Sequence, residues 1–554
     1  MKTCLLATVL VLAVASTGWT VSAVVNKAGT GGAFTTIQAA IDSGADAITI
    51  TDSGVYEENL EIGDPVSGGT AVTLTSTQSG DSRPVITPTT EVKQYSSVER
   101  DNFAYGFGLF ANGSVISNLI IEGHPDVGPM GGLFVMANDV LIENCLFRPR
   151  AGTTQRIGFP NTLLMFAQEG DPATKIPVPG GRNCDGCIVR DCELTGLPTD
   201  AVVEPTADDL GYLEQAATTG RADGLIRMFY QPTDDVITVT FENCFFHHSR
   251  DLGFLPRYSG VGGAGELNIQ VNRCRFDAFY KFALGSEGAN LFVENSIFTR
   301  SNQGKSEDAE RSAINIKTRD GHTPYGEVTN CLFVNCGGAW AQRGYYGGVV
   351  NYSAGTLNVD HCTFVKCLSG VTVAPDGSTG GASENTQMTV SNSIFHQIGY
   401  NGVESLPTVD EDSLPITDAN TNVVNGLFPA WRLGLTNFVR GHLWSAAFNH
   451  FDFHASLDDD SRLIVDNCLV GDIASEDSRA WDTVLAGGID VADNVLGSRL
   501  TTGEVESLDS VTRGTPIFLN TDPDADNPFD LAPGSPGQGL GFSAVSGVGE
   551  WDLY

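Results

Sequence analysis

The chain has 554 residues, of which 64 are glycine and 9% are aromatic, a composition that suits a turn-rich β protein. Its 67 acidic residues outnumber 31 basic residues and give a formal net charge of -36. This balance argues against nucleic acid as a partner, because phosphates are bound by lysine and arginine. We interpret the acidic surface as a means of staying soluble.

Residues 1–23 have the features of a secretory signal peptide. Met1 and Lys2 give a positive start, residues 5–15 are apolar, and residues 21–23 (Val-Ser-Ala) fit a cleavage site. The apolar run is too short to span a bilayer, and we expect no membrane span elsewhere. The sequence thus predicts a protein secreted to the periplasm or the extracellular space, with residues 24–554 folded as one domain.

A short amphipathic helix is predicted directly after the signal peptide. Phe34, Ile37 and Ile41 lie on one helical face, and Thr35 with Gln38 three residues later fits a capping box. Short strands follow this helix, in the pattern expected for the start of a β domain.

From residue 140 onward, one strand motif recurs along the chain. It reads apolar-x-apolar-x-polar-Cys/Ser-x-Phe, usually with Asn before the Cys. The copies begin at residues 140, 188, 239, 269, 291, 326, 357, 388 and 463. Cys244 and Cys274 are 30 residues apart, and Cys331, Cys362 and Ser393 follow one another at 31 residues. Self-similarity at a fixed period indicates a repeat architecture.

A second short strand precedes most copies of the motif, as in residues 313–317 (Ala-Ile-Asn-Ile-Lys). One such coil cannot bury its own apolar face. Stacking equivalent strands about 4.8 Å apart closes the backbone hydrogen bonds and creates a continuous core. We therefore expect columns in which Phe lies on Phe, Cys or Ser on Cys or Ser, and Asn on Asn.

These repeats resemble the right-handed parallel β-helix proteins of the pectin-lyase-like superfamily, from about Val25 to Gly541. The resemblance implies an all-β, right-handed parallel β-helix (a solenoid) whose N-terminal amphipathic helix caps the first coil. Residues 34–62 are similar to the opening of pectin methylesterases, but the catalytic patterns of that family are absent downstream. The superfamily contains lyases, hydrolases, esterases, epimerases, adhesins and phage tailspikes, so the fold alone names no activity.

Three stretches interrupt the coils and are expected to be loops, near residues 148–182, 197–223 and 399–461. The last of these contains Trp431 and Trp444. We consider these residues candidates for stacking on a sugar, with a small core packed on the solenoid as the alternative.

Eleven cysteines remain if Cys4 is removed with the signal peptide. Seven of them share the motif position, and we expect a buried column of free thiols there: Cys145, Cys192, Cys244, Cys274, Cys331, Cys362 and Cys468. Cys336 and Cys367 either stack or form a disulfide across coils. For Cys184 and Cys187 we favour a loop disulfide over a zinc site, because a structural zinc site needs four ligands.

The chain ends in an Asp- and Pro-rich stretch that resembles the closing segment of many bacterial β-helix proteins, which packs under the last coil. Asp522, Asp524 and Asp526 alternate as in a calcium loop, but Asn527 and Pro533 replace the Gly and Glu of an EF-hand. Ca²⁺ is therefore a possible cofactor, with a purely structural ending as the alternative, and we predict no metal-binding residues.

Four residues that follow the second strand recur at intervals of 30: Arg227, Arg257, Glu287 and Lys317. If the register holds, they line successive coils on the outside of a sheet, with Arg319 and His322 close by. We assign Arg227, Arg257 and Glu287 to substrate binding, since such a cluster could hold a uronate carboxylate. Lys317, Arg319 and His322 are the candidate catalytic residues for β-elimination, with Lys317 or Arg319 as the base. The alternative is a ladder of solvated ion pairs.

The stretch from Ala313 to Asn335 is similar to the Arg-Ile-Lys-Thr block of polygalacturonases, in which the Arg and Lys bind substrate. Lys317 matches the Lys, and Asn315 stands in place of the Arg. The Asn-Thr-Asp and Gly-His-Gly steps of that family are missing, so the motifs do not support hydrolysis by paired carboxylates.

A second candidate cluster follows the motif strands of adjacent coils. We expect His247, Asp277, Lys281 and Arg300 to gather there, with a simple turn feature as the alternative.

Together these features predict a secreted, monomeric protein that acts on an extracellular polysaccharide in a lyase-like or glycosidase-like manner. The alternative is a non-catalytic glycan-binding or cell-surface structural protein. It is supported by the lack of a complete catalytic motif and by the small number of basic residues.

Overall fold

The structure is a computed structural model. It describes residues 20–89, 93–95, 103–123, 130–150, 162–171, 174, 176–196, 224–249, 252–258, 260, 263–279, 282–301, 311–336, 346–352, 355–367, 370–374, 386–398, 448–450, 462–471, 498–499, 504–506, 510–525 and 527–545. The predicted signal peptide up to residue 19, the 197–223 loop, Lys281, Trp431, Trp444 and Asp526 lie outside these residues. In the part described, no helix is long and apolar enough to cross a membrane.

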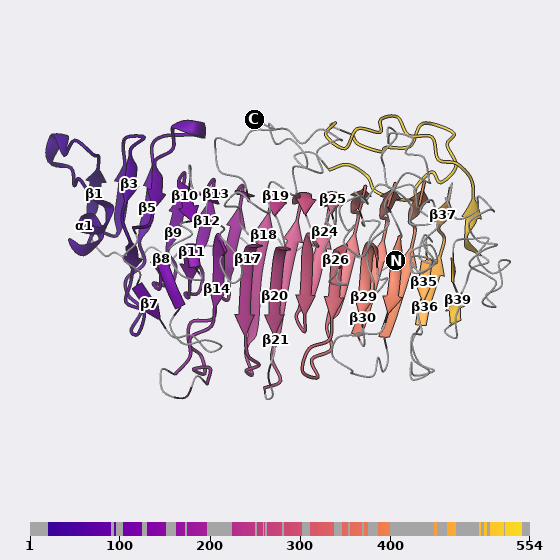
Figure 1. The fold of residues 1–554 in the computed structure, drawn as a ribbon, viewed down its shortest axis with the longest axis horizontal. Coiled ribbons are helices and arrows are strands. Elements are labelled where there is room, and N and C mark those ends of the chain that lie inside the picture. Colours follow the sequence, from indigo (N-terminus) through magenta and orange to yellow (C-terminus); the bar gives the residue numbers. More distant parts are fainter. Residues whose placement is uncertain are drawn as a thin grey trace, which may run out of the picture.

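Three long sheets run the length of the molecule (Figure 1), and each coil adds one strand to each of them in the order A, B, C. Sheet A consists of β1 (Ser22–Val25), β2 (Ala47–Ile50), β5 (Thr73–Ser76), β9 (Val115–Ser117), β12 (Leu141–Glu143), β15 (Cys187–Arg190), β18 (Val236–Glu242), β21 (Glu266–Asn272), β24 (Asn290–Glu294), β27 (Tyr325–Thr329), β30 (Gly355–Asp360), β33 (Thr386–Ser391), β36 (Arg462–Asp466) and β39 (Glu504–Glu506). Its strands alternate buried and exposed residues, so one face lines the core.

Sheet B follows sheet A around each coil. It consists of β3 (Val55–Glu57), β6 (Val85–Thr87), β10 (Ile120–Gly123), β13 (Leu146–Pro149), β16 (Glu193–Thr195), β19 (Phe245–Ser249), β22 (Arg275–Phe279), β25 (Ile297–Ser301), β28 (Leu332–Val334), β31 (Thr363–Val365), β34 (Ile394–His396), β37 (Leu469–Val470) and β40 (Thr512–Arg513). Both faces of its central strands are largely buried, so its outer face is covered as well.

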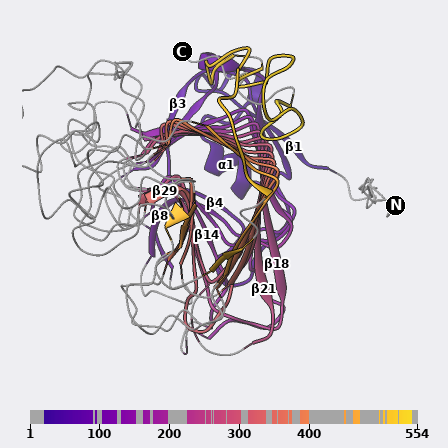
Figure 2. The same cartoon turned by 90° about the vertical axis from the view of Figure 1, so that its right-hand side faces the viewer.

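Sheet C closes each coil (Figure 2). It consists of β4 (Leu60–Ile62), β7 (Lys93–Tyr95), β8 (Phe103–Leu109), β11 (Met130–Val135), β14 (Leu164–Ala167), β17 (Gly224–Tyr230), β20 (Leu252–Tyr258), β23 (Leu284–Glu287), β26 (Arg311–Lys317), β29 (Tyr346–Tyr352), β32 (Val371–Ala374), β35 (Phe448–His450) and β38 (Ser498–Arg499). Among the described strands, β7 alone pairs antiparallel. Two strands, β14 and β35, lie inside ranges that we expected to be loops, 148–182 and 399–461.

A residue in the left-handed backbone conformation turns the chain from sheet A into sheet B. The polar residue before the Cys position has a positive φ, for example 50° at Asn243 and 51° at Asn330. Asn tolerates this conformation better than most residues do, which explains its place in the motif. The amides also bond along the stack, since Asn330 Nδ2 donates to Asn295 Oδ1 at 2.8 Å. The predicted stacking of Asn on Asn is confirmed for this pair and for Asn467 on Asn392, whereas Asp191, Arg273 and His361 take the same position on other coils.

The predicted column of Phe rings is confirmed as well. The five successive pairs have centroids 4.6–4.9 Å apart, with interplanar angles between 3° and 15°. The rings belong to Phe246, Phe276, Phe298, Phe333, Phe364 and Phe395. Each ring therefore fills the space above its predecessor and is buried on both faces.

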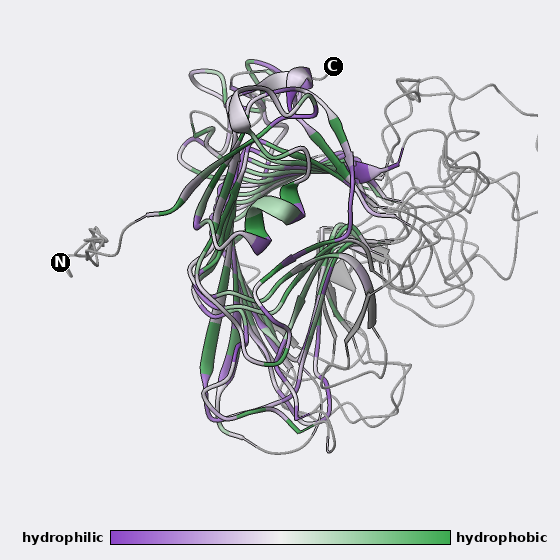
Figure 3. Ribbon diagram, turned by 90° about the vertical axis from the view of Figure 1, so that its left-hand side faces the viewer, coloured by the Kyte–Doolittle hydropathy of each residue, from purple (hydrophilic) through white to green (hydrophobic). Residues whose placement is uncertain are grey.

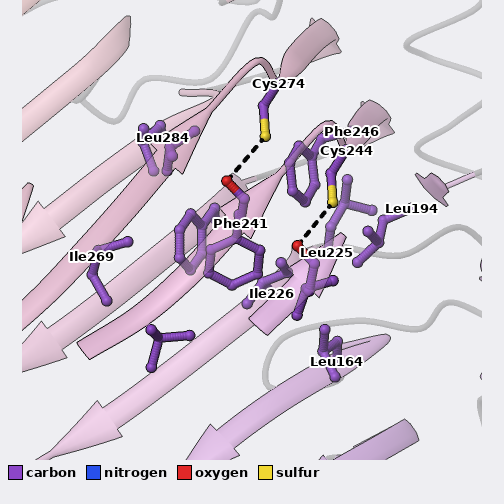
Figure 4. Close-up of a cluster of buried hydrophobic side chains, with 14 of the residues drawn as sticks. Leu164, Leu194, Leu225, Ile226, Phe241, Cys244, Phe246, Ile269, Cys274 and Leu284 are labelled. Carbon is purple, nitrogen blue, oxygen red and sulfur yellow. Dashed lines mark hydrogen bonds between the residues drawn. The ribbon is translucent and has the colours of Figure 1, made fainter. Parts of the chain in front are cut away.

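The cysteines line the same core (Figure 4), and all eleven are buried thiols. Each thiol at the motif position reaches a carbonyl of the preceding coil, as Cys274 Sγ does to Phe241 O at 3.6 Å. Cys336 Sγ and Cys367 Sγ follow the same pattern, at 3.5 Å from Phe298 O and Phe333 O respectively. These two residues therefore stack and do not form a disulfide.

The predicted loop disulfide between Cys184 and Cys187 is wrong, because both are free thiols. Both candidate thiols point into the core, where Cys184 Sγ lies 3.3 Å from Val135 O and Cys187 Sγ lies 3.2 Å from Ala137 O. Each sulfur thus has a carbonyl partner from the preceding coil, and the two residues belong to the solenoid interior.

The helix α1 (Ile37–Asp42) occurs where the sequence predicts it, and Figure 3 shows it at the N-terminal end of the coils. Ile37 and Ala40 belong to the core. The cap residue is Thr36, whose hydroxyl accepts from Ala39 N at 3.4 Å, so the capping box predicted at Thr35 and Gln38 does not form. The role of α1 in closing the first coil stays a prediction. Two short 3-10 turns, Thr30–Gly32 and Gly80–Ser82, complete the helical elements described.

The C-terminal segment does not pack under the last coil, contrary to our expectation. It folds back along the outer face of sheet B, and Figure 1 shows it in yellow along one edge of the solenoid. Phe529 and Phe542 cover apolar residues of sheet B, among them Leu332 and Val365. The reason is apolar burial, because those outward side chains would otherwise face water.

The thiol column gives a test of this interior. Burial raises the pKa of the Cys145, Cys244 and Cys362 thiols and raises that of Cys468 to about 12, so little reactive thiolate forms near neutral pH. We expect an alkylating reagent to modify none of the eleven cysteines in the native protein, and all of them after unfolding without reductant. Peptide mass spectrometry measures both. Rapid native labelling, or protection that persists in denaturant until reductant is added, would contradict the buried-thiol column.

Candidate functional site

Two columns of side chains project from the outer face of sheet C, because Ile314 and Ile316 of β26 face the core and their neighbours face outward. Arg257 of β20 pairs with Glu287 of β23, which pairs with Lys317 of β26. The predicted stacking of these three residues is confirmed.

Arg227 departs from this column. It pairs with Leu255, and Phe229 pairs with Arg257, so Arg227 lies two residues out of the predicted register. The coil that joins β17 to β20 is two residues shorter than the 30-residue spacing assumed for it. In consequence an aromatic ring takes the place expected for a cation, and the Arg257 guanidinium lies 5.7 Å from the centroid of the Phe229 ring.

Glu287 is the centre of the charged cluster. Its Oε2 accepts a hydrogen bond from Arg257 Nε at 2.6 Å and lies 3.7 Å from Arg319 Nη1. The Arg257 contact is a close charge-assisted hydrogen bond, whereas the Arg319 contact is a loose ion pair. The Nε of Arg319 is buried, makes no hydrogen bond among the residues described, and lies 3.8 Å from Asp320 Oδ2 in a second loose ion pair.

A two-residue turn brings Arg319 and His322 to the cluster. Asp320 and Gly321 have φ of 48° and 87°, the conformation that Asp-Gly favours in a tight hairpin turn. Arg319 and His322 exchange backbone hydrogen bonds on either side of it, at 3.2 and 2.8 Å. The turn docks on the end of β20, where Asp320 Oδ2 accepts from Gly260 N at 3.0 Å.

His322 is fixed in one orientation. Its Nε2 lies 3.1 Å from Gly260 O, and its ring meets the Tyr258 ring edge-on at 4.8 Å between centroids. Since a carbonyl oxygen only accepts, Nε2 carries a hydrogen, which leaves Nδ1 as the acceptor of the neutral ring.

The basic residues on this face of sheet C differ in how much of their surface is exposed to solvent. The side chains of Arg257 and Arg319 are 26% and 34% exposed, whereas Lys317 is 6% exposed and Arg227 is 3% exposed. Without Arg227, which lies two residues away from this column, the cluster holds the three cationic side chains of Arg257, Lys317 and Arg319 against the two carboxylates of Glu287 and Asp320. On a chain with a net charge of -36, this is a local reversal of sign that could hold an anionic group.

The second predicted cluster also forms, on the outer face of sheet B. His247 pairs in register with Asp277, whose carboxylate is held by an ion pair with Arg300 and by a 2.6 Å hydrogen bond from the Thr299 hydroxyl. His247 Nε2 lies 3.0 Å from Glu193 Oε1. Lys281, the fourth predicted member, lies outside the described residues.

Asp277 belongs to a charged network that links sheet B to the C-terminal segment. Burial alone would raise the pKa of Asp277, but the charge of Arg300 and its hydrogen bonds outweigh this and hold the pKa well below its usual range. Two residues further back on the same strand, the buried Arg275 pairs with Asp524. Sequence spacing could not have revealed this pair, because its members are 249 residues apart.

The predicted calcium residues lie in the C-terminal segment. Asp524 accepts from Arg275, and Asp522 Oδ1 accepts from the Asp524 backbone at 3.0 Å. Within the described residues, no group of three or more His, Cys, Asp or Glu residues could hold a metal ion. A role for Ca²⁺ stays a prediction.

With this geometry established, comparisons with known proteins place the fold. Residues 228–385 match the family model described as a right handed beta helix region. The chain forms a right-handed parallel β-helix. This is the architecture that the repeats predicted by their resemblance to the pectin-lyase-like superfamily, and no curated protein matches the sequence.

Solved structures with a similar course of the chain are distant. The catalytic domain of Agl-KA has 11% identity and a TM-score of 0.40, with 79% of this chain and 61% of that chain covered. A pectin methylesterase from Aspergillus niger has 13% identity and a TM-score of 0.27, with 68% and 86% covered. A mannuronic acid specific polysaccharide family 6 lyase from human gut microbiota has 10% identity and a TM-score of 0.29, with 77% and 74% covered. Likenesses at this level leave the activity to be argued from the site.

The sheet B network predicts a pH-dependent contribution to stability. Asp277→Asn should lower the free energy of unfolding at pH 7 by about 1.5–3 kcal/mol, because it removes a charged acceptor from Arg300. The folded pKa of Asp277 is depressed, so its contribution is complete above the unfolded value and is lost as pH falls. The difference from wild type should therefore shrink by roughly 1 kcal/mol at pH 3.

Denaturant unfolding at the two pH values measures this difference, with the exposed Asp81→Asn as the matched control. Equal effects of the two substitutions at pH 7, or a difference for Asp277→Asn that does not change with pH, would show that the ion pair contributes nothing.

Proposed function

We propose that this protein is carbohydrate-active, and that it binds and cleaves an acidic polysaccharide on the outer face of sheet C. The observation that carries this proposal is the cluster of Arg257, Arg319 and Lys317 around Glu287, on a chain that is otherwise strongly acidic. Secretion and a monomeric state accompany the proposal as predictions from the sequence.

A uronate polymer suits this cluster because it carries one carboxylate on each sugar. Arg319 is the residue best able to receive such a carboxylate, since its side chain is 34% exposed and its contacts with Glu287 and Asp320, at 3.7 and 3.8 Å, are loose ion pairs and not hydrogen bonds. Arginine binds a carboxylate through two parallel hydrogen bonds. Arg257, which is held by Glu287 at 2.6 Å, would contribute its charge from a fixed position.

Elimination is the reaction that this arrangement favours. Neutralising the uronate carboxylate makes the proton on the adjacent ring carbon more acidic, so a base can remove it. The C–H electrons then form a C–C double bond, the glycosidic C–O bond breaks, and water protonates the departing oxygen. Lys317, next to Glu287 in the column, is the proposed base and accepts the proton as a neutral amine. Arg319, the alternative base named from the sequence, stays charged in this scheme because it binds the carboxylate. His322 shares the tight turn with Arg319 and would hold that residue over the substrate.

A non-catalytic glycan-binding protein is the second candidate. The close pairing of Arg257 with Glu287 favours it, because this carboxylate balances part of the positive charge before any ligand enters. A protein of this kind would bind the same polymers and leave them intact.

The test is incubation with a panel of uronate polymers while ultraviolet absorbance reports unsaturated chain ends. We expect Lys317→Ala to lower kcat/KM at least about 100-fold, as for loss of a positioned base, with the fold intact by circular dichroism. Lys27→Ala is the matched control, since Lys27 lies at the far end of the solenoid against the Tyr56 ring.

Unchanged turnover in Lys317→Ala would remove that residue from the mechanism. Binding without new chain ends, for every polymer in the panel, would favour the second candidate. No binding to any of the polymers would overturn the proposal as a whole.

A further inference from the structure

Asn315 is a buried amide on the outer face of sheet C, two residues before Lys317 on β26. It is 2% exposed, and neither its Oδ1 nor its Nδ2 has a hydrogen-bond partner among the described residues. A single buried polar atom without a partner already destabilises the folded state. In Asn315 both the donor Nδ2 and the acceptor Oδ1 lack one.

Packing does not require an amide at this position. In the column that contains Asn315, the register places Arg227, Leu255 and Gly285 on the preceding coils. An apolar side chain therefore fits this column at Leu255, and an apolar residue at 315 would avoid the cost of the amide. A side chain that is unfavourable for folding, next to a proposed site, is best explained by binding.

The column neighbours of Asn315 toward the preceding coils are apolar and buried. A Cβ atom at Gly285 would lie 2.5 Å from the Phe282 ring and 3.1 Å from Leu255, so these apolar side chains fill the space over the glycine. Leu255 and Phe282 form a small apolar cluster of their own. With Leu255 4% and Phe282 3% exposed, the amide of Asn315 is the polar group of this neighbourhood, and the hydroxyl groups of a pyranose can pair with both its donor and its acceptor.

We propose that Asn315 determines specificity by binding two neighbouring hydroxyl groups of the sugar that lies over β26, one through Oδ1 and one through Nδ2. This rests on the proposed function of the same face and adds a selection rule: the polymer must have unsubstituted hydroxyl groups at that unit. An O-acetylated sugar loses a donor and gains bulk, and it leaves part of the amide unpaired.

The test uses polygalacturonate and alginate, each unmodified and chemically O-acetylated, with affinity measured by calorimetry. Wild type should bind at least one unmodified polymer, and should bind its acetylated form at least about 10-fold more weakly. Asn315→Leu and Asn315→Ala should bind the unmodified polymer about 10- to 100-fold more weakly, with a smaller preference against acetylation. The thermal unfolding midpoints of both variants should stay at or above that of the wild type, because each substitution removes a buried amide that lacks hydrogen-bond partners.

Ser312→Ala is the matched control. Ser312 lies on the same strand, is fully buried, and also has a hydroxyl without a described partner. Its side chain points to the opposite face of the sheet from that of Asn315, toward the core. It should leave the affinities unchanged. Unchanged affinity and unchanged discrimination in both Asn315 variants would overturn this inference alone. If wild type binds none of the four polymers, the proposed function and this inference fall together.

Discussion

The structure depends on the contact between equivalent side chains one coil apart. Phe246 and the five rings stacked after it are spaced 4.6–4.9 Å from centroid to centroid, which matches the separation of neighbouring strands in a sheet. Because the spacing of the rings and that of the strands agree, each coil buries its apolar face against the next without a gap. The thiols extend this interior, and the left-handed turn before the Cys position, most often at Asn, recurs from coil to coil and keeps the coils in the same phase.

The same constraint builds the proposed site. Residues 30 apart, such as Arg257, Glu287 and Lys317, become neighbours on the outside of sheet C because the core fixes their register. The site therefore needs no fold of its own. It needs charged residues at one repeated position and a tight Asp-Gly turn that adds Arg319 and His322. A change in coil length changes which residues stand in the column. Because one coil is two residues shorter, Phe229 and not Arg227 lies beside Arg257.

The sequence was informative wherever a repeat carries the signal. The Phe and Cys columns and the stacking of Arg257 on Glu287 follow from spacing, because a constant period becomes contact in a solenoid. Features outside the period were missed. The two-residue offset of Arg227 depends on one short coil, and Cys184 is buried although it lies outside the motif.

Contacts made by the C-terminal segment lie beyond any repeat. Arg275 meets Asp524 across 249 residues, and nothing in the spacing predicts that this segment returns along sheet B. The unpartnered amide of Asn315 is equally invisible in the sequence, where it is only a departure from a family block. Burial and hydrogen-bond accounting in three dimensions are needed to recognise it.

The stacking of the rings can be tested directly by a double-mutant cycle. Phe298→Ala and Phe333→Ala remove rings whose centroids are 4.9 Å apart, and each should cost about 3–5 kcal/mol of unfolding free energy. Together they should show a coupling on the order of 0.5–1.5 kcal/mol. The pair Phe298→Ala and Phe395→Ala, separated by two intervening rings, should be additive within about 0.5 kcal/mol. Equal coupling in the two cycles would contradict the stacked architecture and the site built upon it.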